Sequence, residues 1–398
     1  MAGCNHSRNE ISTPKYPEAT KYVDIAGSKY QGLKLDYNFF TSVNEFSYQT
    51  SSILIDGSEN QIYSPISLYM ALSMVAEGCS EDALSEVLTV LNVENLEMLR
   101  TENEKLFKKL YFNNDVGKLL LANSIWLNQD RQFVKDTLDI LAEKYYAHSF
   151  SLDFTNSQNG KKIAKWVSEH TGGKLGNENN EFSLRPNMLL ILINTIYFYD
   201  EWVFSFDENL TTSKPFYGDK VDTTLFMNGI VQTKYLKTDQ YELASIPFKN
   251  KCNIVFILPN EDVEITWVLQ NLQSVAGNIQ NTTNKSIILE IPKFSFKSDF
   301  DLIPMLQELG INEIFSNDNS LTNIITNQGY VSSVIQKSYI NVNEKGCEAT
   351  AYTKVTVVET SEPDPEFTLM LNRPFVFVIV NEENLPLFIG VLKDPQTK

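Results

Sequence analysis

The side chains that most often carry enzyme chemistry are sparse in this sequence. No GxSxG nucleophile elbow is present, and the histidines form no pair at helical spacing. The cysteines are scattered without a CxxC pair or the spacing of metal ligands, so they predict neither a metal site nor a disulfide framework. The three histidines are His6, His148 and His170, and the four cysteines are Cys4, Cys79, Cys252 and Cys347. We therefore expect a protein that is not an enzyme and that needs no metal or cofactor.

A different kind of chemistry is indicated by residues 342–375, where a strand pattern runs into a loop pattern. Side chains alternate with period two from residue 347 to residue 357, as in a strand that buries one face. The small or apolar face consists of Cys347, Ala349, Ala351, Thr353, Val355 and Val357, and the other face of Glu348, Thr350, Tyr352, Lys354 and Thr356. Residues 359–366 are too polar and too rich in proline to be buried. A segment that is patterned as a buried strand but leads into a solvated loop is a local conflict, and such conflicts are typical of functional sites. The alternative is an ordinary edge strand followed by a surface loop.

The elements that must position this stretch mix helices and strands. Ser64 followed by Pro65 predicts a helix start, Gly78 its end, and Ser80 the cap of the next helix. Residues 188–198 are almost continuously apolar, which predicts a central strand buried on both faces. Further helices are predicted near residues 33–46, 132–146 and 300–309 and around Ile163, Trp166 and Val167 before Thr171, and further strands within 119–127, 150–154, 241–258, 286–296, 375–380 and 385–392. The pattern is typical of an α+β fold.

Composition and charge limit the domain count and the partners. The chain has 398 residues, 42% of them hydrophobic, and no linker or internal repeat divides it after its first thirty residues, so we expect one domain. A net charge of −17 argues against nucleic acid or an anionic membrane as a partner. It favours basic partners, or is simply an acidic, soluble surface. The longest apolar run is too short for a membrane span of about 20 residues.

Three motifs resemble the serpins, the family of serpin-fold protease inhibitors. NEKGCEATA, which starts at Asn343, resembles their loop hinge, and LMLNRPFVFVI resembles their C-terminal signature. NQIYSPIS resembles their NIxxSPxS motif, and the resemblance extends over nearly everything after residue 30. It implies the α+β serpin fold, with three β-sheets, about nine helices and an exposed reactive-centre loop at about 344–367. We accordingly expect a flexible tail over residues 1–28 and a serpin domain over residues 29–398.

The resemblance also implies a mechanism, in which a protease cleaves the loop and the loop then inserts into the main sheet as a new strand. The protease's own serine attacks, and insertion traps the acyl-enzyme in a 1:1 covalent complex with a monomeric inhibitor. The implied hinge comprises Glu344, Gly346, Cys347, Glu348, Ala349, Thr350, Ala351 and Thr353. Cys347 replaces the usual threonine or serine and Tyr352 the usual alanine, but no inward position is charged or proline. The loop therefore resembles those of inhibitory members, and a non-inhibitory serpin for storage, transport or chaperoning is the alternative.

Several positions match the family's sheet-opening region. These are Ser64, Ser67, Asn194, Gln336, Trp202 and Lys293. The resemblance implies that the polar groups exchange hydrogen bonds as the new strand enters, and Gln336, which stands where the family often has histidine, can both donate and accept. It further implies a salt bridge between Lys293 and Glu344 near Trp202.

The bond that the protease attacks follows from counting along the loop. The resemblance implies that the cleaved residue lies sixteen residues after Glu344, which is Thr360 and gives the bond Thr360–Ser361, whereas counting back twelve from Phe375, as common family members allow, reaches Pro363. We prefer the first count because the insertable length, at about 3.3 Å per residue, sets how far the protease is carried. Val358–Glu359 is the alternative bond. Either bond suits an elastase-like or subtilisin-like protease, because no arginine or lysine stands close to it.

The N-terminal residues bear on localisation. Met1-Ala2-Gly3-Cys4 resembles the end of a bacterial lipobox, in which the cysteine becomes the lipidated first residue. The apolar stretch that precedes a lipobox is absent from the sequence, and a four-residue match also arises by chance. Both interpretations stay open, and we expect an extracellular protein or a cell-surface protein anchored by lipid at Cys4.

Overall fold

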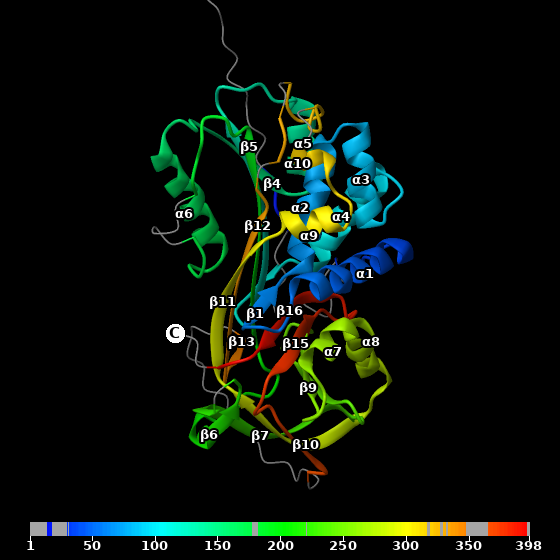
Figure 1. The fold of residues 1–398 in the computed structure, drawn as a ribbon, viewed down its shortest axis with the longest axis vertical. Coiled ribbons are helices and arrows are strands. Elements are labelled where there is room, and N and C mark those ends of the chain that lie inside the picture. Colours follow the sequence, from blue (N-terminus) through cyan, green and yellow to red (C-terminus); the bar gives the residue numbers. More distant parts are fainter. Residues whose placement is uncertain are drawn as a thin grey trace, which may run out of the picture.

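Two β-sheets form the framework of the protein, and helices cover them (Figure 1). The computed structural model describes residues 14–17, 30, 32–176, 182–219, 221–316, 319–326, 329–331, 333–347 and 365–395, and every structural statement below concerns these residues. Ten α-helices occur among them, in agreement with the predicted α+β class. None of these helices is long and apolar enough to cross a membrane.

The seven-stranded sheet contains the strand that leads into the predicted loop. Its strand order is β11-β12-β13-β5-β3-β2. Strand β4 pairs with a later part of β3 than β2 does. Only the β3–β4 pair is parallel. The bounds are β2 Phe112–Asn113, β3 Gly117–Asn128, β4 Ala147–Leu152, β5 Leu190–Glu201, β11 Phe294–Asp301, β12 Ile335–Asn343 and β13 Gly346–Cys347.

The nine-stranded sheet has the order β1-β16-β15-β9-β8-β7-β10-β14, with β6 paired to β7. Its bounds are β1 Gln61–Tyr63, β6 Thr212–Tyr217, β7 Val221–Lys237, β8 Tyr241–Pro247, β9 Asn253–Pro259, β10 Asn284–Pro292, β14 Phe367–Met370, β15 Phe375–Val380 and β16 Pro386–Leu392. The three expected sheets form two hydrogen-bonded ladders because β7, with 17 residues, pairs first with β6 and β10 and then with β8. One long strand thus joins two of the expected sheets.

Helices lie on both sides of the seven-stranded sheet. Helix α6 stands alone on one face, and the larger helical cluster packs on the other (Figure 1). The bounds are α1 Tyr37–Leu54, α2 Pro65–Gly78, α3 Glu81–Leu91, α4 Leu96–Leu110, α5 Lys135–Lys144, α6 Gly160–His170, α7 Ile265–Gln270, α8 Leu272–Gly277, α9 Ile303–Glu308 and α10 Glu313–Ser316. The face of α6 that carries Ile163, Trp166 and Val167 is buried against the sheet, as its amphipathic pattern predicts.

Local capping chemistry explains where several helices begin. Helix α2 starts at Pro65, as predicted, and the Ser64 hydroxyl accepts a hydrogen bond from the Ser67 backbone N–H at 3.4 Å. Ser80 occupies the predicted cap position of α3 but its side chain makes no capping bond. Helix α1 begins later than predicted because Asp36 caps it, accepting bonds from the N–H groups of Asn38 and Phe39.

Two other sequence predictions were wrong in detail. Phe300 belongs to strand β11, so the predicted helix over 300–309 shrinks to α9. Strand β5 is not buried on both faces, because most of its side chains are partly exposed. Among the described residues β5 pairs with β3 along one edge, but along the other edge it pairs only with Gly346 and Cys347 of β13. An apolar run does not reveal that a strand lacks a partner along most of one edge.

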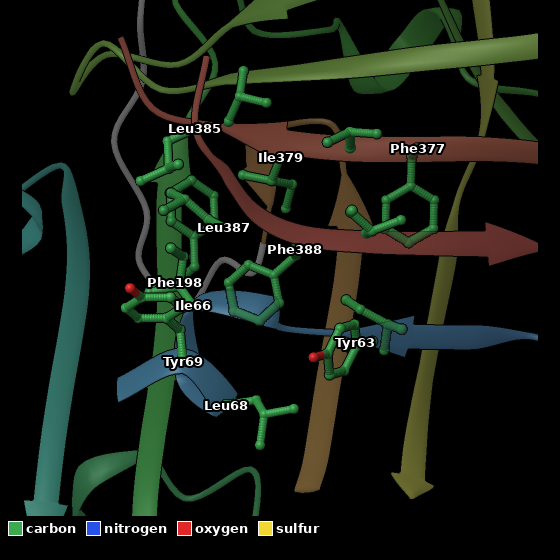
Figure 2. Packing of buried hydrophobic residues seen from close by; sticks show 14 of the residues in the cluster. Tyr63, Ile66, Leu68, Tyr69, Phe198, Phe377, Ile379, Leu385, Leu387 and Phe388 are labelled. Carbon is green, nitrogen blue, oxygen red and sulfur yellow. The ribbon is translucent and has the colours of Figure 1, made fainter. Parts of the chain in front are cut away.

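Part of the hydrophobic core lies where the two sheets meet α2 (Figure 2). Figure 2 shows side chains from β1, the start of α2, β5, β15 and β16 converging there. Tyr63, Tyr69 and Phe377 are fully buried in this region. The SPIS segment is therefore fixed in the centre of the molecule, directly beneath the strands of the seven-stranded sheet.

Candidate functional site

The first turn of α2 is hydrogen-bonded to strand β12. The Ser64 backbone N–H donates to Oε1 of Gln336 at 2.8 Å, and Nε2 of Gln336 donates to the Ser64 carbonyl at 2.9 Å. The Ser64 hydroxyl donates to the carbonyl of Leu387 at 2.8 Å. Both Ser64 and Gln336 are buried. The amide of Gln336 thus donates and accepts at once, which a glutamine can do without a change of protonation.

The same turn of α2 is also bonded to strand β5. The Ser67 hydroxyl donates to Oδ1 of Asn194, and Nδ2 of Asn194 donates to Oδ1 of Asn123 on β3 at 2.5 Å. Asn123 in turn donates to the carbonyl of Tyr145 at 2.6 Å. Sequence reasoning missed Asn123, although an asparagine inside the apolar run LLLANSIWL was a usable signal. Helix α2 therefore holds both β12 and β5, the two strands on either side of β13.

Trp202 fixes the chain where it turns from β12 into the predicted loop. Its side chain is fully buried and stacks on Phe248 with ring centroids 4.5 Å apart. Its indole N–H donates to the carbonyl of Asn343 at 2.9 Å, and its backbone N–H donates to the carbonyl of Lys345 at 2.9 Å. These two hydrogen bonds fix the turn between β12 and β13 to Trp202.

The salt bridge implied for Glu344 is present in this turn. Nζ of Lys293 lies 2.9 Å from Oε2 of Glu344, and the hydroxyl of Thr211 donates to Oε1 at 2.9 Å. Burial by itself would raise the pKa of Glu344, but the hydrogen bonds from Lys293 and Thr211 outweigh it and lower the pKa. Glu344 is thus held ionised at the start of the hinge.

The next two residues form strand β13, which lies between β12 and β5. Gly346 pairs with Asn343 and Glu201, and Cys347 pairs with Val342 and Asp200. A Cβ at position 346 would overlap the carbonyl oxygen of Asp200, so only glycine fits there. The Cys347 side chain is 3% exposed and faces the core, which is the orientation that the period-two pattern predicted.

A small cavity lies next to Cys347. It has room for about one water molecule, and part of it is open to solvent. Ile340 of β12 and Phe198 of β5 contribute to its walls, and Ile62, Ile379 and Phe388, from the nine-stranded sheet, also line it. A strand that continued from Cys347 between β12 and β5 would bring small side chains to this cavity.

Asp200 is a second residue that sequence reasoning missed. It is fully buried and paired with Cys347 across the strands, and its carboxylate accepts bonds from N and Nδ2 of Asn250 at 3.0 and 2.9 Å and from the Glu201 N–H at 2.9 Å. Burial raises the pKa of Asp200 to about 7, although these hydrogen bonds act to lower it. The sequence carried no usable signal for it, because Asn250, which donates to its carboxylate, is 50 residues away in the chain.

The remaining predicted residues lie outside the described part of the chain. They are Cys4, Glu348, Ala349, Thr350, Ala351, Thr353, Val358, Glu359, Thr360 and Ser361. Of the predicted tail over residues 1–28, only residues 14–17 are described, and they pack against the domain.

The geometry defines a protein whose main sheet already holds the first two residues of an additional strand, with the flanking strands bonded to one buried helix. The sequence model of the family described as "Serpin (serine protease inhibitor)" matches residues 41–395, so the chain belongs to the serpin family. Serpins are protease inhibitors and not catalysts, and membership supports inhibition of serine proteases in general.

Individual relatives agree with this assignment. The chain is 29% identical over 402 residues to intracellular coagulation inhibitor 2 of Tachypleus tridentatus, with 96% of each protein covered. It is 28% identical over 370 residues to human Serpin B4, covering 85% of this chain and 94% of that protein. Among solved structures it resembles the thermophilic serpin Tengpin in the native state, with a TM-score of 0.82, 29% identity and coverage of 91% and 95%.

Proposed function

We propose that the protein inhibits serine proteases with a small apolar S1 pocket, and that it acts as a suicide substrate through its reactive-centre loop. The observation that carries this proposal is β13. Gly346 and Cys347 pair with β12 on one side and β5 on the other, so a loop that continues from them has a path into the sheet. The cavity beside Cys347 and the small inward residues at alternate positions of the loop sequence fit that path.

The reaction begins with the target's catalytic serine, which attacks the carbonyl carbon of Thr360. The bond to Ser361 breaks, the new amino group of Ser361 takes up a proton, and Thr360 stays esterified to the protease. Insertion of about a dozen residues then forms roughly twenty backbone hydrogen bonds, each worth about 0.5–1.5 kcal/mol net. The sum of roughly 10–30 kcal/mol, before the entropy of ordering the loop, is large enough to distort the attached enzyme.

The residues of the sheet-opening region control this insertion. Separation of β12 from β5 strains the bonds from Ser64 to Gln336 and from Ser67 to Asn194, which anchor the two strands to α2. Because amides and hydroxyls both donate and accept, these groups can take new partners on the incoming strand without leaving an unpaired polar atom.

The small apolar preference rests on the loop sequence. Thr360 follows Val357 and Val358, and no lysine or arginine lies within five residues of the Thr360–Ser361 bond. Trypsin-like enzymes, which bind a basic side chain through a buried aspartate, are therefore excluded as targets in this proposal.

Incubation with elastase-like and subtilisin-like proteases tests the proposal. We expect a covalent 1:1 complex that survives SDS, and a released C-terminal peptide that begins at Ser361. A peptide that begins at Glu359 would move the reactive bond to Val358 and keep the inhibitor assignment. Complete cleavage of the loop without any complex would instead identify a non-inhibitory serpin.

Attachment to a cell surface through lipid on Cys4 remains a proposal of its own. The mass of the N-terminal peptide from the native source tests it, because a lipidated cysteine at the mature N-terminus adds the mass of its acyl chains. An N-terminal peptide that still carries an unmodified Cys4 would rule out the anchor.

A further inference from the structure

Four residues of the N-terminal region are docked onto the domain far ahead of the first helix. Pro14 and Pro17 are buried, Tyr16 is half-buried and Lys15 is exposed. The short blue trace beside β4 in Figure 1 marks this segment. Helix α1 begins only at Tyr37, and Tyr16 already packs against the main hydrophobic core.

Tyr16 is received by a cluster of four aromatic side chains, here called the aromatic seat. Its ring centroid lies 5.5 to 6.1 Å from each of the four rings, and its hydroxyl lies 3.5 Å from Nδ1 of His148. Separations of 4.5–7 Å are those of attractive aromatic pairs. The residues of the aromatic seat are Phe107, Tyr111, Tyr146 and His148.

The backbone of the aromatic seat is strained at one residue, Tyr146. Tyr146 has a φ of 55°, in the left-handed region that large side chains rarely adopt. This conformation places its ring against Phe107, with centroids 4.4 Å apart, and alongside Tyr16 at 6.1 Å. Strained residues of this kind persist where the surrounding contacts hold them, and they often mark functional sites.

The aromatic seat joins the helical cluster to strand β4 of the seven-stranded sheet. Phe107 lies in α4 and Tyr111 caps its C-terminus, both within the helical cluster. His148 lies on β4, which pairs only with β3 among the described strands. The ring of His148 lies 6.3 Å from that of His170 at the end of α6, on the opposite face. Tyr16 thus bridges the edge of the sheet and α4.

We propose that residues 14–17 form a strap that holds the seven-stranded sheet in its unexpanded form and slows loop insertion before a protease has cut the loop. Insertion requires β12 and β5 to separate, so β5, β3 and β4 shift relative to the helices beneath them by about one strand spacing, ~4.8 Å. A shift of that size between β4 and α4 is close to the whole ring separation in the aromatic seat, so Tyr16 must leave. The strap proposal rests on the loop insertion described under the proposed function, and it adds a control on the rate of that insertion.

The test measures how fast the uncut protein converts to a loop-inserted form. Wild type and Tyr16→Ala are incubated at a raised temperature, and the fraction that has gained a higher thermal midpoint is followed over time without any protease. We expect Tyr16→Ala to convert about tenfold faster, equivalent to 1.4 kcal/mol in the barrier. Lys15→Ala, next to Tyr16 but exposed, and Tyr37→Ala, a tyrosine that is 79% exposed, are matched controls that should convert like wild type.

A peptide that spans residues 12–19 should restore slow conversion when added to Tyr16→Ala, and the same peptide with alanine at the tyrosine position should not. If Tyr16→Ala fails to fold, a variant that lacks residues 1–17 replaces it with the same peptide in trans. Equal conversion rates for these variants and wild type would overturn the strap. Failure of the wild type to inhibit any serine protease would overturn the proposed function alone, since conversion is measured without protease.

Discussion

Replacement of Asp200 by asparagine should stabilise the protein at pH 8 and remove the loss of stability that ionisation of Asp200 causes between pH 4 and 7. Asp200 is fully buried beside Cys347, and the hydrogen bonds to its carboxylate come from the uncharged N–H groups of Asn250 and Glu201. Ionisation of a buried carboxylate without a cation is costly, and the raised pKa of about 7 expresses that cost.

The magnitude follows from the difference in pKa between the folded and unfolded states. An aspartate in an unfolded chain titrates at about 3.9, so between about pH 4 and pH 7 the unfolded state has lost a proton that native Asp200 keeps. The free energy of unfolding therefore falls as pH rises through this window and levels off above pH 7. A difference of about 3 in pKa amounts to about 4 kcal/mol.

The substitution removes the charge but also one acceptor. Asp200→Asn keeps an oxygen for two of the three bonds and turns an NH₂ group toward the Asn250 backbone N–H, which costs about 1–3 kcal/mol. The net gain above pH 7 is then about 1–3 kcal/mol. This gain in the free energy of unfolding is measured by urea unfolding of wild type and Asp200→Asn at pH 4.5, 6 and 8. Asp130→Asn, at an exposed aspartate, is the control. A variant whose midpoints follow pH as steeply as those of wild type would refute the reasoning.

Three further predictions concern the loop. A nick within residues 348–364 should raise the thermal midpoint by tens of degrees, because roughly 10 kcal/mol or more of strand pairing is gained on insertion, and an unchanged midpoint in a melting scan would contradict insertion. Ala351→Glu should turn the inhibitor into a substrate, since an unpaired buried carboxylate costs several kcal/mol, whereas Tyr352→Glu on the outward face should keep its complex on SDS gels. Thr360→Arg should create inhibition of trypsin and weaken that of an elastase-like enzyme, and progress curves in which trypsin stays unaffected would place the reactive bond elsewhere.

The sequence predicted best where the chemistry is local. Ser64 and Pro65 predict a helix start through capping, and helix α2 begins there. The alternation around Cys347 predicts that its side chain is buried, and it is. The inward direction of Ala349 and Ala351 remains a prediction, because they lie outside the described residues.

What the sequence did not reveal depends on contacts between distant segments. Asn123 matters because it pairs with Asn194 from a strand that is 71 residues away. Asp200 accepts a hydrogen bond from Asn250, which is 50 residues away, and a single charged residue near a strand end does not predict that contact. Tyr16 escaped notice because one anchoring side chain produces no periodicity, and periodicity is the signal by which packed segments are found.

The two paired residues of β13 also bear on the kinetics of insertion. The start of a new strand normally carries the entropy of bringing a free loop end to the sheet, a cost that precedes any gain from pairing. For Gly346 and Cys347 this entropy has already been lost, because both residues are paired with β12 and β5 in the uncut protein. In the proposed mechanism, insertion would therefore only have to propagate from these residues, and its speed would depend on how fast β12 and β5 separate ahead of the incoming strand. Loop insertion competes with hydrolysis of the acyl-enzyme, and the pairing of Gly346 and Cys347 before cleavage would favour insertion in that competition.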